Sequence, residues 1–252
     1  MDRRTVVPDA DVAPPSTTAA ASLPARVRAQ TSPAATSEHV SPHASAPPKV
    51  VSAPVRIEGA APPRDDFQLA LYYQRAGDAD RAQTHYRVVL ARNPTNAEAH
   101  NNLGLLLKEA GQLDAAIDEF RRALAVNPQY VRALNNRAVT ELAQGHVDAA
   151  AADLNTALAV DPDNVDALVN LALTRKAAGQ PEDARLLLMR ALVADPRSAA
   201  AHYNLAVQYD REGEITRAVE HYRAFLEFAG ANYAAQAADV RARLARLERG
   251  ES

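Results

Sequence analysis

The stretch AEAHNNLGLLLKEAGQLDAAIDEFRRALAVNPQY, residues 97–130, is one full copy of a pattern that recurs along most of the chain. Three of its residues, Gly111, Ala116 and Pro128, have counterparts at a constant interval of 34 residues. The glycine series is Gly77, Gly111, Gly145, Gly179 and Gly213, the alanine series is Ala82, Ala116, Ala150, Ala184 and Ala218, and the proline series is Pro94, Pro128, Pro162 and Pro196. Because three residue types keep the same interval, the sequence predicts a tandem array of one structural unit, whose function resides in a surface rather than a pocket.

Each unit is predicted to contain two helices. In residues 97–130, helical spacing is kept before the glycine by His100, Leu103, Gly104 and Leu107, and after it by Ala116, Phe120 and Ala123. We expect Gly111 to end the first helix in the left-handed conformation, because a residue without a β-carbon adopts it easily. Pro128 then closes the unit, since proline cannot continue a helix.

The array resembles the tetratricopeptide repeat family, whose signature W-x2-L-G-x2-Y, A-x3-F and P extends over 34 residues. The unit at residues 97–130 matches at Leu103, Gly104, Leu107, Gly111, Ala116, Phe120, Ala123 and Pro128. The chain has no tryptophan, and the first aromatic place of the signature is held by Asp66, His100, Leu134, Leu168 and His202. The resemblance implies an all-α fold: a right-handed α-solenoid of five tetratricopeptide helix pairs plus a C-terminal capping helix.

The composition divides the chain into three parts. Residues 1–62 hold 10 of the 16 prolines and nearly all the serines, which predicts a disordered Pro/Ala/Ser-rich tether. Five units follow at residues 63–96, 97–130, 131–164, 165–198 and 199–230. At residues 231–252, Ala237, Val240, Leu244 and Leu247 share one helical face while arginines such as Arg243 surround it, which is typical of an amphipathic helix that covers the last open edge of an array.

Charge and hydropathy exclude several partners. A net charge of −3, a pI near 6.2 and the absence of a basic block with aromatic residues disfavour nucleic-acid binding. No apolar run approaches the roughly 18 residues that a membrane span needs, so we expect no membrane insertion by this chain. The localisation stays open: the cytoplasm is the default, and the periplasm follows if an upstream anchor or signal has been removed.

The sequence contains no catalytic or metal-binding constellation, and we predict neither enzymatic activity nor a cofactor. No nucleophile motif, P-loop or dinucleotide-binding glycine pattern is present. Ser198 is explained as a helix cap. His85 and His221 occupy the same place in the first and fifth units, so a stacked array holds them far apart, and no metal motif joins the seven histidines.

The resemblance also implies where a partner would bind. In the family, the first helix of each unit lines a concave groove, mainly at the second, fifth, sixth, ninth, twelfth and thirteenth places. The sixth place holds Gln68 in the first unit and then the residues that we call the asparagine ladder, Asn102, Asn136, Asn170 and Asn204. A similar ladder binds extended polypeptides in the superhelical domain of the O-GlcNAc transferases. An amide both donates and accepts hydrogen bonds, so the ladder fits a peptide backbone, although it fits bonds to a neighbouring unit as well.

Other predicted groove residues surround the ladder. They are Asn101 and Asn135, which widen the polar strip, the basic Arg132, Lys176 and Lys108, the aliphatic ninth-place residues Leu105, Val139, Leu173 and Val207, and Tyr203. Six basic and four acidic residues at the lining places make the groove mildly basic, which favours a ligand with some negative charge.

The function that we infer from the sequence is a non-catalytic scaffold or adaptor that binds an extended polypeptide segment in the concave groove. Two alternatives stay open at this point. The chain could be the substrate-targeting arm of a larger enzyme or assembly, for example a glycosyltransferase, or a module that self-associates. The identity of the protein partner and its pathway do not follow from the sequence, because one scaffold serves many systems.

Overall fold

The computed structural model describes residues 65–249, and the predicted tether at residues 1–62 lies outside this range. The described residues form eleven α-helices and one short 3-10 helix. The helices are α1 (Asp66–Arg75), α2 (Ala79–Arg92), α3 (Ala97–Glu109), α4 (Leu113–Val126), α5 (Val131–Ala143), α6 (Val147–Val160), α7 (Val165–Ala177), α8 (Pro181–Ala194), α9 (Ala199–Glu212), α10 (Ile215–Phe228), η1 (Ala231–Tyr233) and α11 (Ala234–Glu248).

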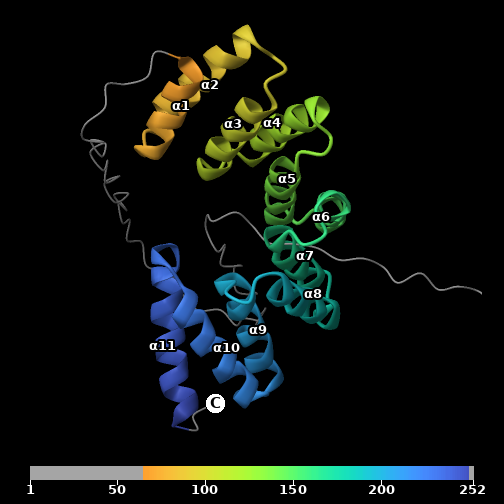
Figure 1. Cartoon of the computed structure of the whole chain (residues 1–252), viewed down its shortest axis with the longest axis vertical. Coiled ribbons are helices and arrows are strands. Elements are labelled where there is room, and N and C mark those ends of the chain that lie inside the picture. The colour runs from red at the N-terminus through yellow and green to blue at the C-terminus, as the bar shows by residue number, and fades with distance from the viewer. Residues whose placement is uncertain (1–64, 250–252) are drawn as a thin grey trace, which may run out of the picture.

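Consecutive helices pack in five pairs, α1 with α2 through α9 with α10, and each pair packs on the next one. Figure 1 shows the pairs stacked along a curve that is open on one side, with α4, α6 and α8 on its outer side. The final helix, α11, packs on α10 and closes the end of the stack. The predicted all-α solenoid of five helix pairs with a C-terminal helix is therefore confirmed.

The turn inside each pair depends on the repeated glycine. All five glycines of the series have positive φ angles, between +74° and +84°, as the sequence predicts. Gly111 has open space where a β-carbon would stand, so only its backbone conformation restricts the residue at this place. Such a left-handed residue lets the chain reverse direction directly after the first helix of a pair.

The core forms two clusters of buried residues, and each of them extends across more than one unit. One cluster of buried apolar residues extends through α1–α4, and a second extends from α4 to α11. Within a pair, a small residue of the first helix faces a large one of the second: a β-carbon on Gly104 would lie 2.6 Å from a ring carbon of Phe120. Because each pair buries its apolar faces against its neighbours, no unit could form this core alone.

Helix α11 is attached by polar as well as apolar contacts. Val240, Leu244 and Leu247 are buried, as expected for a capping helix. Arg243, which the sequence pattern places among the solvated arginines, instead binds Asp210 of α9 in two-pronged fashion, with its Nε and Nη2 atoms 2.9 and 2.7 Å from the two carboxylate oxygens. This pair holds the pKa of the Asp210 carboxyl below its usual value. Asp210 holds the twelfth place of the fifth unit and is one of the four acidic residues predicted at the lining places, so the capping helix neutralises an acid of the predicted groove.

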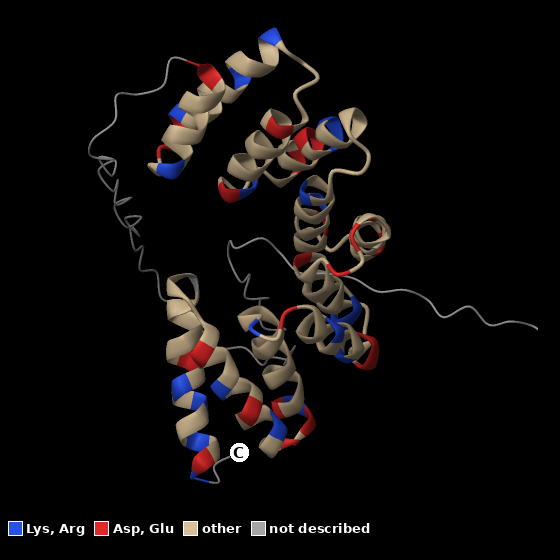
Figure 2. Ribbon diagram, viewed as in Figure 1, with Lys and Arg blue, Asp and Glu red and all other residues tan. Residues whose placement is uncertain are grey.

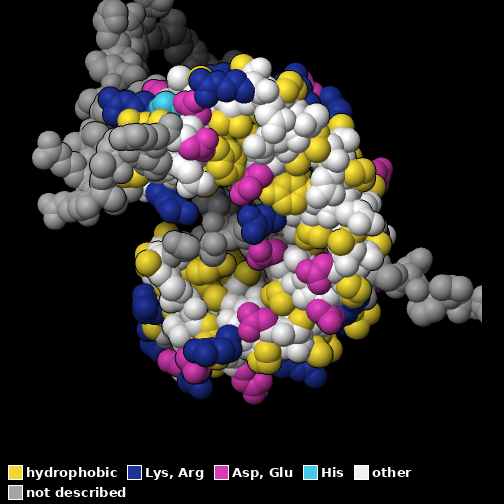
Figure 3. Space-filling view, turned by 45° about the horizontal axis from the view of Figure 1, so that its top comes forward, with side chains coloured by type: hydrophobic (Ala, Val, Ile, Leu, Met, Phe, Trp, Pro, Cys, Tyr) yellow, Lys and Arg dark blue, Asp and Glu magenta, His cyan; other side chains and the backbone are white. Residues whose placement is uncertain are grey.

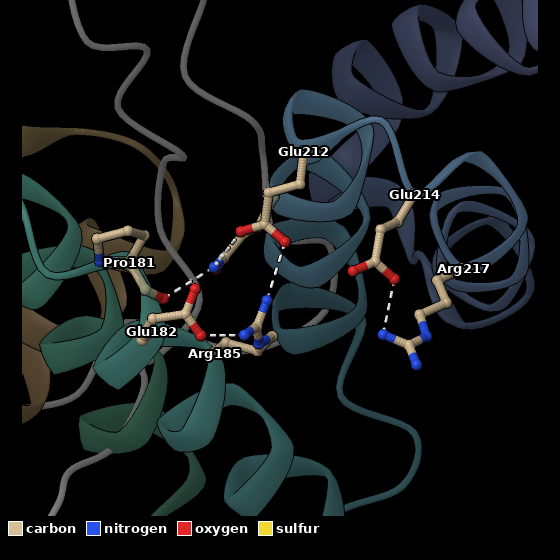
Figure 4. Close-up of polar contacts among 7 residues, drawn as sticks. Pro181, Glu182, Arg185, Glu212, Glu214 and Arg217 are labelled. Carbon is tan, nitrogen blue, oxygen red and sulfur yellow. Dashed lines mark hydrogen bonds and ion pairs between the residues drawn. The ribbon is translucent and has the colours of Figure 1, made fainter.

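The last two units are joined by a polar cluster at their boundary. Arg185 of α8 binds Glu182 one turn earlier in its own helix and reaches Glu212 of α9 at 2.9 Å. Gln208 donates to both the Pro181 carbonyl oxygen, at 2.8 Å, and Glu212, at 2.9 Å. Figure 4 shows these groups converging between the two helices, so the fourth and fifth units have a fixed relation that does not depend on apolar packing alone.

Candidate functional site: the concave wall

The first helices of the units form the inner wall of the curve. Helix α3 contacts α5, α5 contacts α7, and α7 contacts α9, although each of these pairs is separated in sequence by an intervening helix. Such contacts are possible where the units converge, which is the inner side of a curved stack. Figure 2 shows that acidic and basic residues are mixed along the described helices, so no long single-sign face dominates this wall.

The ninth places of the units form a row of half-exposed aliphatic side chains. All members of the row have intermediate burial: Leu71, Leu105, Val139, Leu173 and Val207. Most of them pack partly against the buried core while the rest of the side chain stays accessible. Tyr203, also partly buried, packs its ring against Phe225 with 5.2 Å between the ring centroids. Figure 3 shows apolar and charged side chains alternating over the molecular surface that it presents.

The asparagine ladder does not have one uniform role. Asn136 donates from Nδ2 to Oδ1 of Asn101 in the preceding unit, at 2.9 Å, and Asn101 donates in turn to Asn102, at 3.1 Å. Asn101 is only 2% exposed. It therefore does not widen an exposed polar strip, as the sequence suggested, but links two units from inside the wall.

The equivalent pair one unit later is Asn170 and Asn135, and it is arranged differently. Both residues are buried, with 2% and 3% exposed. Among the described residues, the Asn170 Nδ2 atom has no acceptor and the Asn135 Oδ1 atom has no donor. Asn170 and Asn135 are the counterparts of Asn136 and Asn101, which bond to each other one unit earlier. In this pair the corresponding hydrogen bond between units is not formed.

The two end members of the ladder lack such a partner. The residue that would accept from Asn204 is Val169, and the residue that would accept from Asn102 is Phe67. Asn204 instead donates to the Ala200 carbonyl oxygen of its own helix, at 2.9 Å. Both side chains are partly exposed. Asn204 therefore bonds within its own helix, whereas the Asn102 side chain accepts from Asn101 and forms a hydrogen bond with Tyr86 of the first unit.

Two of the predicted basic groove residues, Lys108 and Lys176, lie where burial disfavours their positive charge. Burial lowers the pKa of Lys108, with Glu109 partly opposing that effect. Burial and the nearby charge of Arg211 both lower the pKa of Lys176. Arg132 is exposed. The neighbouring cations Lys176 and Arg211 make the end of the wall formed by α7 and α9 favourable for a negatively charged group.

Two open depressions lie elsewhere on the surface. One, of about 640 Å³, is lined by residues of the first two units that include Leu90, Pro94 and Glu119. The other, of about 360 Å³, lies where the start of α7, the start of α9 and Tyr233 meet. The second depression adjoins the concave wall at its C-terminal end, which extends the accessible surface toward η1.

The sequence analysis did not predict that histidines form side-chain pairs between the two helices of a unit. The residues 19 apart in a unit face each other across its two helices: His100 lies 2.6 Å from Glu119, and His202 Nδ1 lies 2.9 Å from His221 Nδ1. Their common spacing of 19 residues could have revealed them. Within residues 65–249, no group of three or more potential metal ligands is found.

The comparisons with known proteins agree with this architecture. Models of the tetratricopeptide repeat match residues 67–130, 102–165 and 141–206. A search of curated proteins finds no significant match. Among solved structures, PilF of Pseudomonas aeruginosa is 25% identical with a TM-score of 0.63, over 73% of this chain and 83% of that one. PilW, described as a type IV pilus biogenesis factor, is 24% identical with a TM-score of 0.60, over 65% and 76% of the two chains. YrrB, described as a tetratricopeptide protein with an unusual peptide-binding site, is 18% identical with a TM-score of 0.52, over 69% and 90%.

The chain therefore belongs to the tetratricopeptide repeat family. Proteins of this family act in general as protein-interaction scaffolds, and that broad role applies to this chain. None of the helices in the described part of the chain has the length and apolarity to cross a membrane.

Proposed function

We propose that the concave wall binds an extended segment of another polypeptide and that the chain acts as a non-catalytic adaptor. The observation that carries the proposal is the ninth-place row of aliphatic residues, which stay partly exposed in all five units. A wall that repeats one apolar contact at regular intervals fits a ligand whose alternate side chains point the same way, as they do in an extended peptide.

The accessible amides supply the second kind of contact. Asn136 and Asn204 use Nδ2 within the array, which leaves the amide oxygen of each for a backbone N–H of the ligand. Asn102 is partly exposed as well, whereas Asn170 is buried. Asn136 and Asn204 can thus contact a ligand backbone without selecting its side chains.

The charges supply selection. Burial and the nearby charge of Arg211 lower the pKa of Lys176, and a ligand carboxylate near the Lys176 ammonium group would offset both effects. Lys108 and Arg132 add positive charge in the units before them. The ligand best suited to this wall is an extended segment with aliphatic residues and an acidic residue toward the end that contacts α7 and α9.

The test uses peptides selected from a random display library against the full chain, with binding measured by fluorescence anisotropy. In the variant Asn204→Ala, which removes a side chain bonded only to the backbone of its own helix and leaves the Asn136–Asn101 bond intact, we expect binding to weaken by about tenfold. Lys176→Gln should weaken the binding of acidic peptides more than the binding of the same peptides with amide side chains in place of the carboxylates.

A matched control exchanges exposed residues of the outer helices, Arg121→Ala with Thr156→Ala. These substitutions should leave peptide affinity unchanged. Equal affinities for the groove variants and the control would contradict the proposal.

A further inference from the structure

Four of the first helices end in basic residues on the side of the concave wall. Their last turns contain Arg75 in α1, Lys108 in α3, Lys176 in α7 and Arg211 in α9. Each follows the aliphatic ninth-place residue of its own helix by three or four positions, as Lys108 follows Leu105. Because residues three or four apart share a helix face, the four side chains form a second row, one turn beyond the aliphatic one. We call Arg75, Lys108, Lys176 and Arg211 the basic row.

The helix dipole does not by itself explain the basic row. Basic residues in a last turn offset the partial negative charge at the C-terminal end of a helix. The second helices α4, α6, α8 and α10 have the same dipole, and none of them has a basic residue in its last turn. The second helix α2 does end in Arg92, but this residue forms an ion pair with Asp66. The basic last turns without such a partner therefore belong to the concave wall.

The charges of the basic row are not used inside the array. Arginines elsewhere bind carboxylates, as Arg137 binds Asp153. Among residues 65–249, no ion pair involves a member of the basic row. Asp210, the acid directly before Arg211, is bound by Arg243 of the capping helix instead. The basic row thus offers its positive charge to a ligand.

The third unit interrupts the basic row with an apolar residue. Helix α5 has no basic residue in its last turn and holds Leu142 at the place of Lys108 and Lys176. Leu142 is partly buried and packs against the apolar core. Positive charge therefore lies on both sides of an apolar place, with Lys108 in the unit before it and Lys176 and Arg211 in the units after it.

The stacking of the units sets the distance between the two charged places. Helix α3 contacts α5, and α5 contacts α7. Figure 1 shows these three helices following one another along the stack. Packed helices lie roughly 8–10 Å apart, so Lys108 and Lys176, which are two helices apart, are separated by about 16–20 Å. An extended chain advances about 3.3 Å per residue and covers this distance in about five to six residues.

We propose that the segment bound to the concave wall carries two acidic residues about five to six positions apart, one at Lys108 and the other at Lys176 and Arg211. An apolar residue between them packs against Leu142. This inference rests on the proposed function and specifies its partner. The partner is an acidic and apolar polypeptide instead of a nucleic acid, because the aliphatic row lies one turn from the charges. The acid at Lys176 contributes more, since Arg211 adds positive charge there while Glu109 reduces it at Lys108.

Peptides selected from a random display library against the full chain test this pattern. We expect the selected sequences to share two acidic residues about five to six positions apart, with an aliphatic residue between them. If the selected peptides are weakened by Asn204→Ala but their acidic residues have no common spacing, this inference is wrong and the proposed function is not. If no peptide binds the wall, both are wrong.

Double-mutant cycles between peptide and protein assign each acid to its lysine. Exchanging the acid at Lys176 for its amide should weaken binding by about tenfold, and the same exchange at Lys108 by about threefold. Each exchange should have little further effect in Lys176→Gln or Lys108→Gln, respectively, but its full effect in Lys176→Arg or Lys108→Arg. Arg121→Gln, on the outer helix α4, is the matched control and should leave both effects unchanged. Additive effects of the peptide and lysine changes would overturn the assignment.

A gain of binding separates charge recognition from loss of the fold. Leu142→Lys introduces the residue that α3 and α7 have at the same place, so the fold accommodates it. This variant should bind a peptide with glutamate in place of the central apolar residue at least about threefold more tightly than the wild type does. A single-stranded oligonucleotide should not displace the selected peptide from the wild type. Displacement by the oligonucleotide, or no gain for Leu142→Lys, would overturn the proposal.

Discussion

The residue at the fifth place of the preceding unit decides which ladder asparagines can bond between units. Asn136 bonds to the neighbouring unit because that unit offers Asn101, whereas Asn204 faces Val169 and bonds within its own helix. An asparagine at the fifth place is necessary for this inter-unit bond but does not suffice, because Asn170 has Asn135 in the preceding unit and its Nδ2 atom still has no acceptor among the described residues. Reading the two places together would have separated the ladder residues that can form the bond from those that cannot.

This difference gives a stability prediction at the residue scale. Asn136→Ala leaves the buried Oδ1 atom of Asn101 without its inter-unit donor, so we expect a loss of about 1–3 kcal/mol in the free energy of unfolding. Asn204→Ala leaves no buried side-chain group unpaired and should cost less than about 0.5 kcal/mol. Urea denaturation followed by circular dichroism measures both, and equal losses would show that the inter-unit bond has no special weight.

The His202–His221 contact gives a second residue-scale prediction, on pH. His202 Nε2 lies 3.0 Å from the Pro196 carbonyl oxygen, which only accepts, so His202 carries its proton there and its Nδ1 accepts from His221. Burial lowers the pKa of His221, and so does the positive charge that a protonated His202 would carry. The surrounding groups are Tyr209 stacked on His221, Arg217 over the Tyr209 ring, Phe228 beside His202, and Glu220, which slightly favours the proton.

Because the pKa of His221 is lower in the folded state, the unfolded chain binds the proton more readily. The stabilisation is thus fully present above pH 6.5, the ordinary value for histidine, and is lost as the pH falls. Hydrogen exchange should show α9 and α10 opening more readily in mild acid than at neutral pH. The double variant His202→Leu and His221→Leu, which copies Leu168 and Leu187 of the fourth unit, should lose this difference; if it keeps the difference, the pair is not its source.

At the element scale, the packing of a helix pair depends on matched small and large residues. The place of Gly104 holds alanine in the other four units, and the place of Phe120 holds tyrosine or leucine. Alanine is the better helix former, yet a β-carbon on Gly104 would lie 2.6 Å from the Phe120 ring. Glycine at this place is therefore a packing requirement of one pair and not a helix end.

We expect Gly104→Ala to destabilise the chain by about 1–3 kcal/mol, although the same change in an exposed helix would stabilise it. The combination Gly104→Ala with Phe120→Leu copies the Ala138 and Leu154 pair of the third unit and should recover most of the loss. A double-mutant cycle of unfolding free energies measures the coupling. Additive effects would mean that the close approach does not limit this pair.

The elements themselves were largely predictable from the sequence, because each repeated residue has a local cause. Gly111 marks a left-handed turn and Ala116 a close helix contact, and both effects act within one unit. The contacts between units were not predictable in this way. The Arg243–Asp210 pair and the Asn136–Asn101 bond join residues 33 and 35 positions apart, and their geometry depends on how the units stack.

At the scale of the whole molecule, the array separates two surfaces. The inner wall holds the repeated aliphatic row and the accessible amides, and the outer face carries the exposed apolar side chains Leu186, Met189 and Val193 in the fourth unit. A repeated feature suits a ligand that runs along the stack, whereas a local one suits a contact at a single point.

Hydrogen exchange of the full chain, with and without a saturating selected peptide, tests the adaptor function most directly. We expect the peptide to slow exchange in consecutive first helices, α3, α5, α7 and α9, and to leave the exposed faces of α4, α6 and α8 unchanged. Protection confined to the second helices, or to a single unit, would contradict a ligand that extends along the concave wall.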